Sequence, residues 1–165
     1  MRASVGGMTQ RVQLTPGHSK SFKALLALAG EITRAGADAG LDPLLLELIK
    51  IRASQVNGCA ACLDMHTADA VQLGENPHRI FMLDAWRETE LFTEQERSAI
   101  ELTEVITRLS QTQDVPDEVY QRAMTAFTEA QYVAVGWMIM LINCFNRLGA
   151  PSRPRLPERP HVSVG

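Results

Sequence analysis

The chain has 165 residues, a net charge of −3 and only 5% aromatic residues. This length is typical of one domain that can bury its own core. The negative charge and the few aromatic side chains disfavour a nucleic-acid or anionic-membrane partner. Three cysteines are too few, and odd in number, for a secreted disulfide scaffold, and residues 1–10 lack the apolar segment of a secretory signal. The longest apolar run, residues 132–142, is short for a membrane-spanning helix. We therefore expect a cytoplasmic protein without a nucleic-acid or membrane partner.

Seven segments carry apolar residues at helical spacing, and none alternates as a strand does. In chain order, helices are predicted over residues 19–35, 43–55, 59–73, 77–86, 94–110, 116–126 and 130–148. Gly36 and Gly149 are expected to end the first and the last of them. Capping boxes beginning at Thr93 and Thr128 define two of the starts. The predicted fold class is all-α, with six or seven helices in one domain over residues 16–150. A flexible arm over residues 1–15 and a tail over residues 151–165 flank it.

The helix predicted over residues 130–148 is apolar nearly all round. Such a helix lies either in the centre of a core or at a subunit interface. Because a domain of this size has little capacity to surround one helix completely, we expect the protein to form a homo-oligomer. Cys144, within this helix, is expected to be a core residue.

Two cysteines, Cys59 and Cys62, stand three residues apart at the start of a predicted helix. At helical geometry their Cα atoms lie about 5 Å apart, which a disulfide can bridge. His66 follows Cys62 by one turn, on the same face. The first turn of a helix favours an anion and lowers the pKa of a thiol there, and the thiolate is the nucleophile. The spacing predicts a thiol redox site in which His66 takes the proton from Cys62.

Glu47 belongs to the preceding helix and lies at the edge of its apolar stripe, about 40° from Ile51 at 100° per residue. There its carboxylate is placed to orient and charge His66, as the third group of a triad does. The alternative is an ordinary surface acid paired with Lys50 or Arg52. Arg52 itself falls inside the apolar arc and is expected to need a buried partner.

Glu47, the run from Arg52 to Cys59, Cys62 and His66 together resemble the AhpD-like alkylhydroperoxidase branch of the carboxymuconolactone decarboxylase family. The resemblance implies an all-helical trimer or hexamer with thiol peroxidase activity on hydroperoxides. It also implies that Cys62 attacks the peroxide, Cys59 resolves the sulfenic acid to a disulfide, and Glu47 and His66 relay the proton. Position alone favours the lower pKa for Cys59, but a base beside Cys62 can outweigh that difference, so we follow the assignment that the resemblance implies. The expected reductant is a dithiol, either a protein-bound lipoyl group or thioredoxin.

One position departs from the best-known AhpD proteins, which carry a second histidine where this chain has Ala61. We therefore expect a shorter or weaker proton path. The decarboxylating branch typically lacks the cysteine pair, so decarboxylation is not expected. Two alternatives stay open. One is a redox-sensing or binding oligomer whose Cys59–Cys62 disulfide switches without significant turnover. The other is zinc bound by Cys59, Cys62 and His66, although zinc prefers four ligands. No cofactor or metal is expected.

Overall fold

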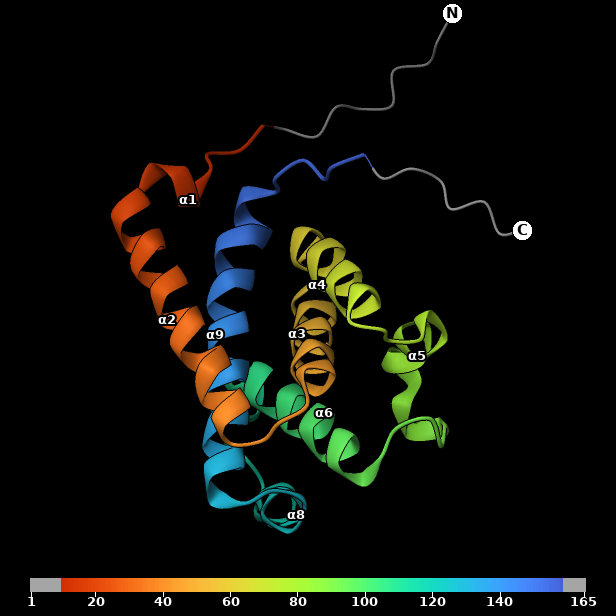
Figure 1. The fold of residues 1–165 in the computed structure, drawn as a ribbon. Helices are drawn as coiled ribbons and strands as arrows, with labels where there is room; N and C mark the ends of the chain where they lie inside the picture. Colours follow the sequence, from red (N-terminus) through yellow and green to blue (C-terminus); the bar gives the residue numbers. More distant parts are fainter. Residues whose placement is uncertain (1–9, 159–165) are drawn as a thin grey trace, which may run out of the picture.

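Nine α-helices and one 3-10 helix account for the regular structure of residues 10–158, the range that a computed structural model describes (Figure 1). In chain order they are α1 Leu14–Gly17, α2 Ser19–Asp38, α3 Pro43–Asn57, α4 Ala60–Gln72, α5 Pro77–Met82, η1 Leu83–Glu88, α6 Glu94–Thr107, α7 Leu109–Thr112, α8 Asp117–Ala126 and α9 Glu129–Ser152. No strand occurs within this range, which confirms the all-α prediction. The helices that were not predicted, α1 and α7, are single turns. Of the predicted arm and tail, residues 1–9 and 159–165 lie outside the described residues.

Side-chain caps explain where α3, α6 and α9 begin. Asp42 accepts a hydrogen bond from the backbone N–H of Leu44 at 2.9 Å, and proline occupies the first position of α3. Thr93 and Thr128 each form the predicted capping box at the starts of α6 and α9. These bonds satisfy backbone N–H groups that have no partner inside a helix. The starts of these helices are therefore fixed by local sequence.

Two glycines that were predicted to end helices lie inside them instead. Helix α2 continues past Gly36 and helix α9 continues past Gly149. A Cβ atom at Gly36 would lie 3.1 Å from Cδ1 of Leu46, and one at Gly149 would lie 2.8 Å from Sγ of Cys59. These two glycines allow a neighbour to pack closely, so the predicted ends were wrong. Gly58, by contrast, has a φ of 66° and does end α3.

Helices α3 and α9 form the centre of the molecule (Figure 1). Helix α3 packs against α4, α6 and α9, while α9 also packs against α2, α4 and α6. Their most deeply buried side chains include Leu48, Ile49, Ile51, Val135, Ile139 and Ile142. Burying each such side chain contributes roughly 1.5–3 kcal/mol. Among the described helices, α9 alone has the length and apolar composition of a membrane span, but other helices pack against it, as they do around a core helix.

One face of α9 is left uncovered by the rest of residues 10–158. Val133, Trp137 and Met140 are 47–50% exposed, and Cys144 follows them on the same face at helical spacing. The prediction that Cys144 is a core residue was therefore wrong. An all-round apolar sequence predicts that the helix is central, but it does not reveal which of its faces the other described helices leave exposed.

A buried ion pair links α3 to α6 and supplies the partner that Arg52 was expected to need. Arg52 and Glu104 are 5% and 4% exposed, and Nε of Arg52 donates to Oε1 of Glu104 at 2.8 Å. Nε1 of Trp86 donates to the same oxygen at 3.0 Å, and Arg87 donates to Oε2 at 2.9 Å. Burial alone would raise the pKa of Glu104, but hydrogen bonds from Trp86, Arg87 and Arg52 outweigh it and hold the pKa below its ordinary value.

Candidate active site

The two neighbouring cysteines lie at the junction between α3 and α4. Gly58 takes the left-handed conformation that lets the chain turn, and the backbone N–H of Cys59 bonds to the carbonyl of Ser54 at 3.0 Å. Cys59 is then the N-cap residue of α4, and Cys62 lies in its first turn. The two cysteines form a disulfide, with Cα atoms 5.4 Å apart. The spacing predicted from the sequence is therefore the spacing in the structure.

All four predicted site residues are buried. Cys59 and Cys62 are 1% and 6% exposed, and Glu47 and His66 are 6% and 7% exposed. Cys62 and His66 lie one turn apart on α4, while Glu47 comes from α3, which packs along α4. Of the two sulfur-bearing residues, Cys62 is thus the more accessible.

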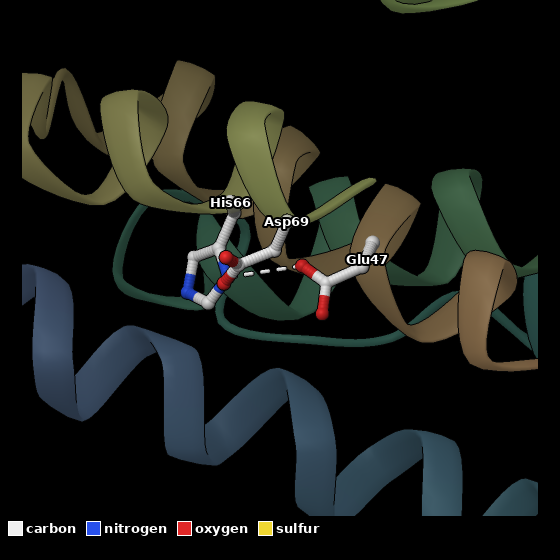
Figure 2. A group of neighbouring side chains, drawn as sticks. All are labelled: Glu47, His66 and Asp69. Atoms are coloured by element: carbon white, nitrogen blue, oxygen red, sulfur yellow. Dashed lines mark hydrogen bonds and ion pairs between the residues drawn. The ribbon is translucent and has the colours of Figure 1, made fainter. Parts of the chain in front are cut away.

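A hydrogen bond joins Glu47 to His66. Oε2 of Glu47 lies 3.0 Å from Nδ1 of His66 (Figure 2), and Oε1 of Glu47 pairs with the ammonium group of Lys50. Because a carboxylate only accepts hydrogen bonds, Nδ1 carries the proton and Nε2 keeps its lone pair. The second ring nitrogen points away from Glu47 in Figure 2. The histidine is therefore oriented as a base. The pairing of Glu47 with Lys50, which was part of the surface-acid alternative, also occurs, but both side chains lie largely out of solvent.

The environment of Glu47 keeps its side chain charged at neutral pH. Burial alone would raise the pKa of Glu47, but hydrogen bonds from His66 and Lys50 outweigh it and hold the pKa below its ordinary value. A carboxylate at 3.0 Å from Nδ1 stabilises the imidazolium that forms when His66 accepts a proton. The pair can therefore accept a proton from a thiol and return it later.

Asp69 adds a second carboxylate near His66, with Oδ2 3.9 Å from Nδ1. Glu47, His66 and Asp69 offer three potential ligand atoms within 4.8 Å of one another (Figure 2). A cation there would compete with the ammonium group of Lys50, which already neutralises Glu47. The zinc site considered above would use both thiolates, which only the reduced form of the pair offers. The ion pair with Lys50 thus disfavours a cation beside Glu47 and His66.

A chain of side-chain amides, which the sequence did not predict, joins α9 to the end of α3. Nδ2 of Asn57 donates to Oδ1 of Asn143 at 3.0 Å and to Oδ1 of Asn146 at 2.8 Å. Nδ2 of Asn146 donates in turn to Oγ of Ser54 at 3.0 Å. Asn143 and Asn146, three residues apart in a mostly apolar helix, were the sequence feature from which these bonds could have been predicted. The bonds fix α9 against the segment that leads into Cys59.

A groove of about 940 Å³ lies elsewhere, between α2 and the first half of α9. Its apolar lining includes Leu28, Ile32, Val133 and Trp137, and Glu31 and Asp38 also line it. Gly149 lies beside the two sulfurs, and Trp137 lies twelve residues before it in α9. These two residues are therefore about 18 Å apart along the helix axis. The groove is therefore separate from the cysteine pair.

Comparisons with known proteins place the chain in a family. Residues 20–105 match the model of the carboxymuconolactone decarboxylase family. The uncharacterized protein YdfG of Bacillus subtilis is 49% identical over 141 residues, which cover 86% of this chain and 92% of YdfG.

Several solved structures share the fold, among them the following two. One is a protein of unknown function from Agrobacterium tumefaciens, named as a candidate antioxidant defence protein AhpD. It has a TM-score of 0.83 and 30% identity, and the match covers 92% of this chain and all of that one. The other is an uncharacterized peroxidase-related protein from Silicibacter sp. TM1040, with a TM-score of 0.71 and 20% identity. That match covers 82% of this chain and 69% of the other, and it supports the fold alone. The chain belongs to the carboxymuconolactone decarboxylase family, in its AhpD-like group.

Proposed function

We propose that the protein is a thiol-dependent peroxidase that reduces hydroperoxides through a dithiol/disulfide cycle of Cys59 and Cys62. The observation that carries the proposal is a disulfide-forming pair placed one turn from a buried histidine whose other side bonds a carboxylate. The family also includes decarboxylases, as its name states. A cysteine pair in disulfide contact favours redox chemistry instead, since decarboxylation involves no change in thiol oxidation state.

In the first step, Nε2 of His66 takes the proton of the Cys62 thiol, and the thiolate attacks the outer oxygen of the hydroperoxide. The O–O bond breaks, an S–O bond forms, and Cys62 becomes a sulfenic acid. The leaving alkoxide takes the proton back from His66 and departs as an alcohol. Glu47 stabilises the charged imidazolium between these two transfers. The greater exposure of Cys62 supports its assignment as the attacking residue.

In the second step, the sulfur of Cys59 attacks the sulfur of Cys62. The S–S bond forms, the S–O bond breaks, and hydroxide leaves with the Cys59 proton as water. A dithiol such as a lipoyl group or thioredoxin then exchanges with the disulfide and is itself oxidised. The cycle converts one hydroperoxide and one dithiol into an alcohol, water and an oxidised reductant.

The direct test is stoichiometric oxidation followed by turnover. The reduced protein should consume one equivalent of hydroperoxide and lose the mass of two hydrogens at Cys59–Cys62, as seen by mass spectrometry. Catalytic consumption should then continue with dihydrolipoamide or thioredoxin. If both thiols remain free, or are oxidised only to sulfinic and sulfonic acids, the proposal fails. If the disulfide forms but the rate does not exceed that of free cysteine, the redox-sensing alternative is favoured.

Glu47→Gln should lower kcat/KM for the hydroperoxide by about 10²-fold, at the low end of what general acid–base catalysis contributes. The neutral amide still fills the space beside His66, but it no longer stabilises the imidazolium. Peroxide consumption measured across pH 5–9 checks this expectation. Glu31→Gln is the matched control, because Glu31 lies on α2 with an exposed side chain. Equal rates for the two variants would remove Glu47 from the mechanism.

We also propose that the protein assembles as a homo-oligomer, a trimer or a hexamer, through the uncovered face of α9. Val133, Trp137 and Met140 expose apolar surface there, and Val133 and Trp137 also line the apolar groove beside α2. Contiguous apolar surface of this kind is typical of protein–protein interfaces.

Trp137→Lys should therefore shift the protein toward smaller species, because a charge would be buried in the interface. Sedimentation velocity of the reduced protein measures this. Phe81→Lys is the matched control, since Phe81 is 76% exposed on α5. A monomeric wild-type protein, or loss of assembly only in the Phe81 variant, would contradict the proposed interface.

A further inference from the structure

We propose that Gly149 is a positioning residue of the redox site, because its missing side chain makes room for the Cys59–Cys62 disulfide against α9. A Cβ atom at this position would lie 2.8 Å from Sγ of Cys59 and 3.4 Å from Sγ of Cys62. The first distance is far shorter than a van der Waals contact between carbon and sulfur. The backbone of α9 thus forms one wall of the site, with no room for a side chain between it and the sulfur of Cys59.

This wall is held in place on both sides of Gly149. One turn before it, Asn146 is 1% exposed and bonds to Asn57 and Ser54 at 2.8 and 3.0 Å. Three residues after it, the carbonyl of Ser152 accepts a hydrogen bond from Nε2 of Gln13 at 2.7 Å. A methyl group at position 149 could not be accommodated by a small movement of α9 without breaking these bonds. The sulfurs would have to move instead.

The two redox forms differ in how easily the sulfurs can move. In the disulfide, each sulfur is tied to the other and to its own backbone, so neither can rotate away. In the dithiol, each side chain can turn about its Cα–Cβ bond to another rotamer. An added methyl group therefore destabilises the oxidised form more than the reduced form. Glycine at position 149 therefore favours the disulfide and the step of the proposed cycle that forms it. This inference rests on the proposed redox cycle of Cys59 and Cys62.

The test measures the dithiol/disulfide equilibrium directly. Wild type, Gly149→Ala and Gly136→Ala are equilibrated in mixtures of reduced and oxidised dithiothreitol, and free thiols are alkylated and counted by mass spectrometry. Gly149→Ala should shift the equilibrium at least tenfold toward the dithiol, which corresponds to about 30 mV toward positive potential. Gly136→Ala is the matched control in the same helix, because a Cβ atom there has no neighbour within 4 Å. It should leave the midpoint unchanged.

Thermal unfolding of both redox forms separates positioning from packing. Gly149→Ala should lower the Tm of the oxidised form more than that of the reduced form. An unchanged midpoint, an equal loss of Tm in both forms, or failure of the reduced variant to fold would each overturn the inference. None of these measurements uses a peroxide. A wild-type protein without peroxide turnover would therefore sink the proposed function alone, while an unchanged midpoint in an active peroxidase would sink only this inference.

Discussion

Cys62→Ser is expected to abolish peroxide turnover, by roughly 10³-fold or more, as removal of a catalytic nucleophile usually does. Cys59→Ser should instead react once and stop at a sulfenic acid on Cys62, because no resolving thiol remains. The difference follows from the geometry. Cys62 lies one turn from His66 inside α4, whereas Cys59 is the N-cap residue and almost completely buried. Steady-state peroxide consumption measures the first effect, and dimedone trapping followed by mass spectrometry measures the second.

The third cysteine provides the control for this pair of variants. Cys144 is an exposed free thiol on the outer face of α9, and Cys144→Ser should retain full activity. The opposite pattern would also be informative. If Cys59→Ser stopped peroxide consumption and Cys62→Ser left a sulfenic acid on Cys59, the roles would be reversed. The field of the helix N-terminus would then outweigh the nearby base in selecting the nucleophile.

The parts of the site that could be predicted from the sequence are those that helical periodicity determines. The spacing of Cys59, Cys62 and His66 places them on one helix face whatever surrounds that helix. Glu47 was predicted from its angle to the apolar stripe of α3, and the structure puts its carboxylate 3.0 Å from His66. Periodicity defines which face a residue occupies, and for adjacent helices in the chain this is nearly sufficient to bring partners together.

Contacts between elements far apart in the chain could not be predicted in the same way. The position of Arg52 in an apolar arc indicated that a buried partner exists, but Glu104 is 52 residues away. Glycines were ambiguous for the same reason. Gly58 ends a helix through its own backbone conformation. Gly36 and Gly149 instead leave space for side chains of other helices, which the sequence does not identify. Local sequence patterns therefore identified the candidate site residues, whereas tertiary packing determined which residues surround them.

Glu104→Ala is expected to cost about 3–5 kcal/mol of unfolding free energy, because it leaves the buried guanidinium of Arg52 without its main counter-charge. The change also removes the acceptor for the indole N–H of Trp86. Urea unfolding followed by circular dichroism measures the loss. Glu101→Ala is the matched control on the same helix, since its partner Arg122 lies at the surface. A much smaller loss is expected there, because exposed ion pairs are screened by water.

The same carboxylate should make stability depend on pH in a defined direction. Folding lowers the pKa of Glu104 and the pKa of Glu47. In both cases burial alone would raise the pKa, but the hydrogen bonds outweigh it. As the pH falls toward the ordinary pKa of 4.5, these two carboxylates therefore become protonated in the unfolded chain before they do in the folded chain. The stabilisation is complete above that pH and is lost as the pH falls through the lower, folded-state values. Urea unfolding at several pH values between 3 and 6 should show this decline in wild type and a shallower one in Glu104→Ala. Equal slopes would mean that Glu104 is not charged in the folded protein, and the buried ion pair with Arg52 would have to be abandoned.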